Sequence, residues 1–312
     1  TRENASAIAQ ICFRLDGIPL ALELAAARAN VLTVEQISKR LDDRFRLLTG
    51  GARTALPRQQ TLRALIDWSY NLLAEEERLL FRRLAVFVGG WTLEAAESVC
   101  SGEGIESDRI LDLLSQLVNK SLVVMAEENG ESRYRTLETI RQYAREKLFE
   151  SGEGETLRNK HMRAFLELAE KMEPEIRGAN QLDGLDRMEA EYENVRAALE
   201  WSREQDLETC ARLINALWRF WDFRGSLLET KEWYEQILDL TQDQRTVTRA
   251  RILARASSFF RNLTARQKAL ELAENAVTLS RALNDKATLA QALTTQGELT
   301  LGATVFDRRR VP

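Results

Sequence analysis

The stretch from Ser121 to Ala144 constrains the fold of this chain more than any other, because it predicts a β-hairpin within a sequence that otherwise has helical patterns. Residues 121–127 and 133–135 have strand-forming patterns, and Asn129-Gly130 lies between them. Both central positions of a two-residue hairpin turn need a positive φ, which Asn and Gly tolerate best. Two strands alone cannot bury an apolar face, so this hairpin must pack on helices beside it.

The residues around the hairpin predict the helices that it needs. Amphipathic or capped helices are expected at 61–73, 74–88, 93–99 and 108–119, and a further helix follows Thr136. Helices that lead into a two-stranded wing form a winged helix, which we place at residues 51–150. Only four prolines and fifteen glycines interrupt the 312 residues, so the chain as a whole is expected to be mostly α-helical.

The charges of this winged helix argue against direct binding to DNA. The helix before the wing carries Arg109 and Lys120, but Asp108 and Asp112 lie beside them. Contacts to phosphate need clustered Lys and Arg, and a net charge of −4 supplies no field toward DNA. The wing tip adds three acidic residues: Glu127, Glu128 and Glu131.

Residues 1–50 predict a small helical bundle. Apolar residues recur at helical spacing up to Leu15, and Pro19 is placed to open a second helix. Thr33 and Gln36 predict the capping box of a third helix, residues 34–41. These helices are too short to be stable alone, so we expect a neighbouring domain upstream of Thr1 in a longer protein.

The second half of the chain predicts paired helices. Residues 151–205 read as a helical linker, in which Pro174 is expected to stop the first helix. Beyond it, small residues inside apolar helices recur about every 40 positions, at Ala216, Ala256 and Gly297. This period is typical of an α-solenoid of tetratricopeptide-like helix pairs, which we place at residues 206–312 and expect to be truncated, because no pattern continues after Leu301.

A group of aromatic residues falls in the first of these repeats. Such groups more often form a core than a ligand site, but concave solenoid faces bind partners. The candidate partner-binding residues are therefore Trp218, Trp221, Phe223 and Trp233.

The cysteines and the single histidine do not predict metal or catalytic chemistry. Cys12, Cys100 and Cys210 are far apart in apolar helical contexts, so we expect buried, reduced thiols. His161 is expected to be structural. No segment has the run of about 20 apolar residues that spans a bilayer, and we expect a cytoplasmic protein.

Three strings resemble the C-terminal half of the STAND class of signalling ATPases, and among these the NB-ARC-like bacterial regulators of the SARP and LuxR types. They are ICFRLDGIPLALELAAARA, LDDRFRLLTGG and RQQTLRALIDWSYNLLAEEERLLFRRLAVFVGGWTLEAA. The resemblance covers roughly residues 4 to 300. In that family the proline of a G-[LI]-P-L motif packs on the adenine of ADP or ATP. The resemblance therefore implies nucleotide contacts at Gly17, Ile18, Pro19 and Leu20, although a proline at the first position of a helix is also explained by helix geometry alone.

The resemblance also implies a phosphate contact where the chain leaves the wing. The family has Met-His-Asp there, and its histidine touches the β-phosphate of ADP; this sequence has Thr136, Leu137 and Glu138. Leu137 cannot donate a hydrogen bond. Nearby arginines could replace the histidine, or could simply form a solvated face: Arg133, Arg135 and Arg141.

The phosphate-binding loop GxxxxGK[ST] does not occur in these residues, nor does an apolar strand that ends in paired acids. The chain is thus not expected to be an enzyme by itself, and the parent protein is expected to be a slow ATPase that holds ADP or ATP through an upstream nucleotide-binding domain. The function implied is the regulatory and sensor portion of a STAND switch, with an effector on the solenoid and oligomerisation on activation. The alternative is a tetratricopeptide-type scaffold for protein–protein interactions with no switching role.

Overall fold

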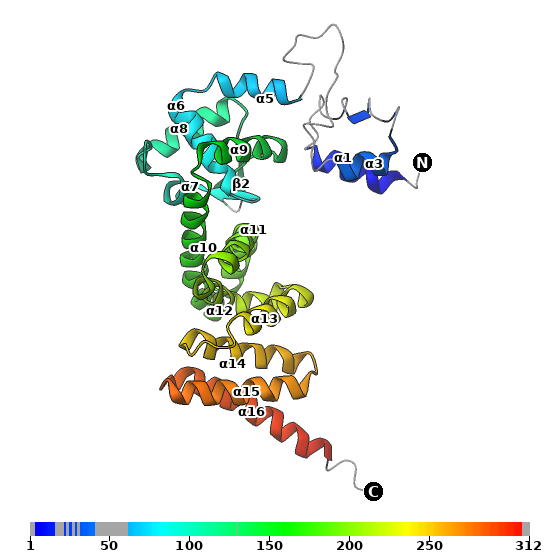
Figure 1. Ribbon diagram of the computed structural model, residues 1–312, viewed down its shortest axis with the longest axis vertical. Helices are drawn as coiled ribbons and strands as arrows, with labels where there is room; N and C mark the ends of the chain where they lie inside the picture. Colours follow the sequence, from blue (N-terminus) through cyan, green and yellow to red (C-terminus); the bar gives the residue numbers. More distant parts are fainter. Residues whose placement is uncertain are drawn as a thin grey trace. The chain divides into compact units, whose positions relative to one another are not determined.

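The computed structural model describes residues 4–15, 22, 25, 26, 29, 32–40, 62–128 and 130–307 (Figure 1). The chain divides into two compact units, residues 1–161 and 162–312. Both units are built mainly from helices, as predicted. The finer division at residues 50, 150 and 205 stays a prediction.

At the start of the first unit, α1 (Ala5–Arg14) contacts α3 (Val34–Arg40). The guanidinium of Arg14 donates a hydrogen bond of 2.7 Å to the carbonyl oxygen of Ser38. The predicted capping box is confirmed, because Gln36 N lies 3.2 Å from Thr33 Oγ1 and Thr33 N lies 3.1 Å from Gln36 Oε1. The predicted helix at Pro19 lies outside the described residues.

The expectation of three buried thiols is wrong for Cys12, which is exposed. Ile11 and Leu15 are four residues apart, share one face of α1 and are buried. Cys12 is one position further around the helix and therefore points away from that buried face.

The winged helix begins with α5 (Leu62–Asn71), α6 (Glu75–Arg83) and a short 3₁₀ turn (Leu84–Val86). The elements that follow are β1 (Gly90–Thr92), α7 (Leu93–Cys100), a 3₁₀ turn (Ser107–Arg109), α8 (Ile110–Asn119), β2 (Val124–Glu128), β3 (Glu131–Arg135) and α9 (Glu138–Ser151). Its core includes Trp91, which stacks on Phe87 with ring centroids 5.3 Å apart.

The predicted hairpin is confirmed, and it belongs to a sheet of three antiparallel strands in the order β1-β3-β2. The central strand β3 pairs on both sides, with Tyr134 opposite Trp91 of β1 and opposite Met125 of β2. Gly130 has φ +80°, as the predicted turn requires, whereas Asn129 lies outside the described residues. Strand β2 begins at Val124 rather than at Ser121, because Ser121 has φ +59° and cannot continue a strand.

Gly152 and Glu153 form a short break between two helices. Helix α9 ends before Gly152, which has φ +76° in the left-handed region, and α10 (Gly154–Arg177) begins two residues later. The expected stop at Pro174 is wrong, because α10 continues to Arg177. Proline costs a helix one hydrogen bond and a clash with the preceding turn, which this helix tolerates close to its end.

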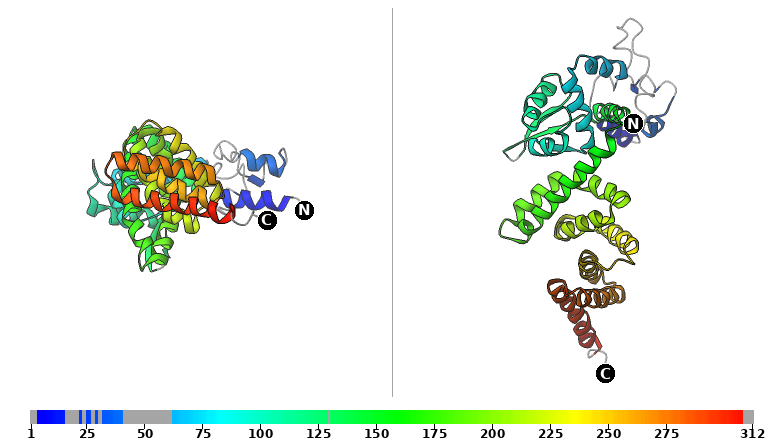
Figure 2. Two further views of the ribbon diagram at one scale, coloured as in Figure 1. Left: turned by 90° about the horizontal axis from the view of Figure 1, so that it is seen from below. Right: turned by 60° about the vertical axis from the view of Figure 1, so that its left-hand side comes forward.

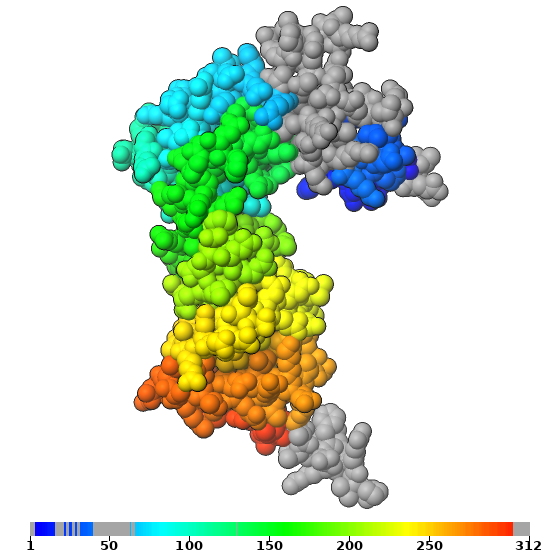
Figure 3. Space-filling view, in the orientation of Figure 1, coloured from blue at the N-terminus to red at the C-terminus, as the bar shows by residue number. Residues whose placement is uncertain are grey.

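The second unit is a run of paired helices (Figure 2). They are α11 (Gln181–Gln205), α12 (Leu207–Arg224), α13 (Leu227–Leu240), α14 (Val247–Asn262), α15 (Arg266–Ala282) and α16 (Lys286–Asp307). Each contacts its neighbours along the chain or the next helix but one, and Figure 3 shows α13, α14 and α15 as adjoining layers from yellow to orange. Helix α16 extends beyond Leu301, where the sequence pattern ends.

The small residues of the repeat do not all have the same packing role. Ala216 and Ala256 are buried inside α12 and α14. Gly297 in α16 has open space where a Cβ would lie, since no other atom comes within 4 Å. Close helix crossing therefore explains the first two positions and not the third.

Candidate functional site

The cations of the helix before the wing are held in ion pairs by acids of the same domain. The guanidinium of Arg109 lies 3.1 Å from Asp112 and 3.4 Å from Glu76. The ammonium of Lys120 lies 2.5 and 2.6 Å from the two carboxylate oxygens of Glu77, which is 2% exposed. These charges are already compensated, and α8 offers none of the clustered Lys and Arg that a DNA phosphate contact requires.

The same pattern continues in the wing. Arg133 of β3 forms an ion pair of 3.5 Å with Glu128 of β2. Glu127 and Glu131 are exposed beside it. The wing therefore presents an acidic edge, which disfavours a polyanion as its partner.

Leu137 and Glu138, where the resemblance implies a phosphate contact, lie at the point where the wing joins α9. Leu137 caps α9, and its carbonyl oxygen accepts a hydrogen bond of 2.8 Å from Arg141 N. The carboxylate of Glu138 accepts two hydrogen bonds from the Arg141 guanidinium, at 2.7 and 2.9 Å. The charge of Glu138 is thus balanced by Arg141, which is one of the three arginines considered as replacements for the family histidine. The other predicted contacts, Gly17, Ile18, Pro19 and Leu20, lie outside the described residues.

Two further arginines extend this site beyond what the sequence analysis identified. Burial lowers the pKa of Arg145, and the like charges of Arg141 and Arg158 lower it further, while Glu138 opposes them. Arg145 of α9 therefore lies near two other guanidinium groups, one of them from α10, and near the carboxylate of Glu138. Arg141 and Arg145 are four residues apart on one helix, and this spacing was the available sequence signal.

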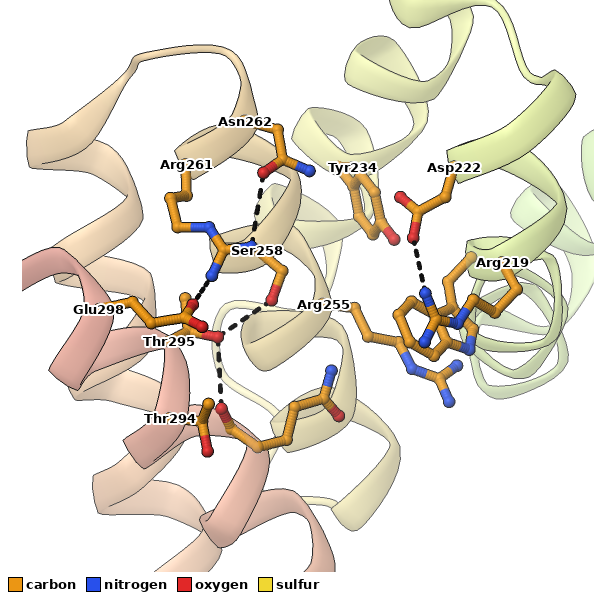
Figure 4. A pocket seen from close by; sticks show the side chains of 12 residues that line it. Arg219, Asp222, Tyr234, Arg255, Ser258, Arg261, Asn262, Thr294, Thr295 and Glu298 are labelled. Atoms are coloured by element: carbon orange, nitrogen blue, oxygen red, sulfur yellow. Dashed lines mark hydrogen bonds and ion pairs between the residues drawn. The ribbon is translucent and has the colours of Figure 1, made fainter. Parts of the chain in front are cut away.

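A pocket of about 450 Å³ lies in the second unit, lined by α12, α13, α14 and α16 (Figure 4). Its volume falls within the range of about 300–1,000 Å³ that is usual for small-molecule sites. Its lining is mainly polar and charged, with the rings of Trp218 and Tyr234 among the side chains.

On the α12 wall, the ring of Trp218 is covered by two guanidinium groups, with Arg219 at 4.2 Å and Arg255 at 4.9 Å from its centroid. The Trp218 Nε1–H donates a hydrogen bond of 2.9 Å to Glu173. Asp222 lies 3.6 Å from Arg219. Burial raises the pKa of Asp222, against the opposing charges of neighbouring arginines.

The opposite wall joins α14 to α16. The hydroxyls of Ser258 and Thr295 lie 3.0 Å apart and share a hydrogen bond. Arg261 forms an ion pair with Glu298, as the dashed line in Figure 4 shows. Further neutral hydrogen-bonding groups on this wall come from Asn262, Gln291 and Thr294.

Of the four predicted partner-binding aromatics, Trp218 lines the pocket. Trp221 and Trp233 are 4% and 6% exposed and belong to the core, where Trp221 Nε1 donates a hydrogen bond of 2.9 Å to the Tyr192 hydroxyl. Phe223 is 52% exposed and does not line the pocket.

Arg255 is a pocket residue that the sequence analysis missed. Its spacing could have revealed it, because Arg255 lies three residues after Ile252 and four before Phe259. Residues at this spacing share one helix face, and both apolar residues are buried. An arginine on the apolar face of a helix is unusual unless it is paired or functional.

The single histidine has the structural position expected for it. His161 is 3% exposed, and its ring meets Phe87 edge-on with centroids 5.5 Å apart. Within the described ranges, no three His, Cys, Asp or Glu side chains are grouped to hold a metal ion. None of the described helices has the length and apolar character needed to cross a membrane.

Comparison with known proteins identifies the winged helix. The family described as "Winged helix-turn-helix domain" matches residues 73–149. This confirms the winged helix predicted from the hairpin and its helices. The chain is mostly helical, with this domain and its small three-stranded sheet followed by a run of paired helices.

The chain is also similar to mycobacterial proteins. It is 44% identical over 306 residues to the "Putative HTH-type transcriptional regulator Rv0890c" of Mycobacterium tuberculosis, which covers 94% of this chain and 34% of the relative. It is 46% identical over 156 residues to the "Uncharacterized protein Rv0894" of the same organism, covering 50% of this chain and 40% of that protein. The chain thus spans about a third of the length of the regulator.

Among solved structures, the chain matches the crystal structure of a Signal Transduction ATPase with Numerous Domains (STAND) protein with a tetratricopeptide repeat sensor, PH0952 from Pyrococcus horikoshii. The match has 16% sequence identity and a TM-score of 0.30, and it covers 91% of this chain and 50% of that one. A score of this size does not establish a common fold.

Proposed function

We propose that this chain is the regulatory and sensor portion of a nucleotide-dependent signalling switch in a bacterial, cytoplasmic transcriptional regulator. The observation that carries the proposal is the compensated charge of the winged helix. Arg109, Lys120 and Arg133 are each paired with an acid of their own domain. A winged helix of this kind is suited to contact another protein domain rather than DNA.

The similarity to a mycobacterial HTH-type transcriptional regulator supports the choice of protein class, because it extends over 94% of this chain. In this proposal the helix-turn-helix that reads DNA belongs to another part of the full-length protein. The winged helix instead contacts the nucleotide-binding domain of that protein and holds it in its ADP state.

The paired helices supply the sensor in this mechanism. An effector bound there with different affinities in the two states would shift the winged helix away from the nucleotide domain and allow exchange of ADP for ATP. Oligomerisation would follow. The pocket lined by α12, α13, α14 and α16 supports this part of the proposal, because it has room for a small effector.

The charge argument is tested by fluorescence anisotropy of a labelled random-sequence DNA duplex. The unaltered chain should show no saturable binding at physiological salt. Replacing Glu127, Glu128 and Glu131 with Lys should create binding that weakens as salt rises, because the wing would then attract phosphate. Saturable, salt-dependent binding by the unaltered chain would contradict the proposal.

The nucleotide role is tested in the full-length protein by calorimetric titration with ADP. Pro19→Ala should weaken binding by removing the implied adenine contact, and Arg141→Gln should weaken it if the arginine replaces the family histidine. Arg109→Gln, which alters an exposed pair of the same domain, is the control. Unchanged affinity in Pro19→Ala would remove the adenine role, and a full-length protein that binds no nucleotide would favour the scaffold alternative.

A further inference from the structure

Arg255 has a guanidinium group that the protein buries without fully compensating it. Its side chain is 13% exposed, and burial lowers its pKa to about 10. Nη1 donates one long hydrogen bond of 3.3 Å to Asn215, and Nε is buried without a hydrogen-bond partner among the described residues. Desolvating a charge in this way is costly unless something pairs with it.

The acid nearest to Arg255 is shared with other groups. Glu173 lies 3.6 Å from Arg255 Nη2, which is beyond hydrogen-bond distance. The same carboxylate accepts a hydrogen bond from Trp218 Nε1 at 2.9 Å and lies 3.5 Å from Arg177. Glu173 therefore compensates Arg255 only in part, and it does not line the pocket.

The charged residues of the lining are three arginines and two acids: Arg219, Arg255 and Arg261, with Asp222 and Glu298. Arg261 pairs with Glu298, and Asp222 lies 3.6 Å from Arg219. The pocket consequently has one positive charge in excess, at Arg255. A ligand with a single negative charge would complete the balance, whereas a dianion would meet repulsion from the two lining carboxylates.

The uncharged residues of the lining indicate which other groups the ligand carries. Hydroxyls of Ser258, Thr294 and Thr295 and the amides of Asn262 and Gln291 present neutral donors and acceptors across from Arg255. Figure 4 shows the Arg255 side chain extending from α14 toward Arg219, so that its guanidinium lies on the side of the pocket away from Thr294 and Thr295. Groups of this kind hydrogen-bond hydroxyls and amides. A cavity of about 450 Å³ has room for a small molecule.

We propose that this pocket binds a small polar monocarboxylate, with its carboxylate on the Arg255 guanidinium and its hydroxyl or amide groups on the α14 and α16 wall. Hydrogen bonds between two charged groups are the strong kind, and a planar guanidinium matches a carboxylate well. The inference names the ligand class for the sensor proposed above and rests on that role for its biological meaning.

The experiment is calorimetric titration of the full chain, without nucleotide, with two matched pairs of probes. D-gluconate is paired with sorbitol, which has the same hydroxyl-bearing chain but no carboxylate, and N-acetylglutamine is paired with its carboxamide. At least one acid should bind saturably at millimolar concentration or below, and its neutral partner should not. Equal binding of both members of a pair would overturn the proposal, as would no binding by either acid.

Two variants locate the site. Arg255→Gln should weaken binding of the acid by at least about tenfold, since a hydrogen bond to a charged group is lost. Arg281→Gln, which changes an exposed residue of α15 outside the pocket, should bind as the unaltered chain does. Should Arg255→Gln fail to fold, Thr294→Trp gives an independent test, because Thr294 is exposed and a large ring there would fill the pocket. Unchanged binding in Thr294→Trp would overturn the assignment.

Two further probes separate other sources of negative charge. Inorganic phosphate should bind more weakly than the acid, and tighter binding of phosphate would overturn the choice of a monoanion. A Ser-Gly-Ser peptide with a free C-terminus is compared with its amide, and binding of that peptide acid alone would show that the carboxylate comes from a protein end, against a small free ligand. None of these results alters the ADP measurement in the full-length protein, so each proposal can fail without the other.

Discussion

The guanidinium of Arg83 on α6 contacts the carboxylate of Glu153, 70 residues later, with Nη2 2.7 Å and Nε 3.2 Å from Oε1. Arg83 also donates to the carbonyl oxygens of Cys100, Gly102 and Glu103, and its side chain is 4% exposed. One buried side chain thus joins α6, the loop after α7 and the junction between α9 and α10.

Replacing Arg83 with Met should destabilise the winged helix by about 3 kcal/mol, because the carbonyl oxygens of Cys100 and Glu103 and the Oε1 atom of Glu153 lose the hydrogen bonds that Arg83 donates. Hydrogen exchange of α9 amides, followed by mass spectrometry, would report this loss. Arg109→Gln breaks an exposed pair with Asp112 and should cost less than about 1 kcal/mol. Equal effects of the two changes would contradict the special role of Arg83.

The Glu153 contact also predicts a dependence of stability on pH. Burial alone would raise the pKa of Glu153, but hydrogen bonds and charges from Arg83 and Arg82 outweigh it and hold the pKa below its ordinary value. A carboxyl whose pKa is lowered in the folded state stabilises the fold above its unfolded pKa of about 4.3, and this contribution is lost as pH falls through the folded pKa. Urea unfolding of the wild type and Glu153→Gln should therefore differ at neutral pH and converge in acid. A difference that is constant with pH would show that the carboxylate charge is not responsible.

The small residues of the repeat predict opposite responses to added volume. Gly297→Ala should raise the free energy of unfolding of the second unit by about 0.5–1 kcal/mol, because the new Cβ meets no atom and the unfolded chain loses freedom. Ala256→Leu should lower it by about 1–3 kcal/mol or more, because Ala256 is fully buried. Thermal unfolding of both variants checks the signs. A stabilising Ala256→Leu or a destabilising Gly297→Ala would refute this account of the packing.

The thiols should differ sharply in reactivity. Burial raises the pKa of Cys100 to about 12 and that of Cys210 to about 11, so neither is exposed or ionised in the folded chain. Cys12 is exposed. Titration with a chromogenic disulfide reagent should label one thiol in the native protein and all three after denaturation, and Cys12→Ser should remove the native reaction. Rapid labelling of two native thiols would contradict the described burial.

Local patterns predicted the elements whose signals are local. Gly130 and the strands on either side of it gave the hairpin, and Thr33 with Gln36 gave a helix start. Strand β1 was missed because three residues are too few to show alternation, and it forms only by pairing with β3. The predicted helix stop at Pro174 was wrong because proline disrupts helix interiors, whereas Pro174 lies three residues before the end of α10.

The candidate sites depend on residues that meet only after folding. Asp222, Arg255 and Glu298 belong to three different helices, and no spacing along the chain announces that they line one pocket. Arg145 and Arg158, which lie near each other, combine α9 with α10 in the same way. The nucleotide contact implied for Gly17, Ile18, Pro19 and Leu20 stays a prediction from resemblance.

Strand β3 is hydrogen-bonded along both of its edges, and only Thr136 and Leu137 separate it from α9. Because this connection is so short, a displacement of the first turn of α9 is transmitted to β3. Strand β3 cannot shift without breaking its hydrogen bonds to β1 and β2. A displacement of that turn would therefore move the three-stranded sheet as a unit, together with Trp91 of β1, instead of being taken up by a loop.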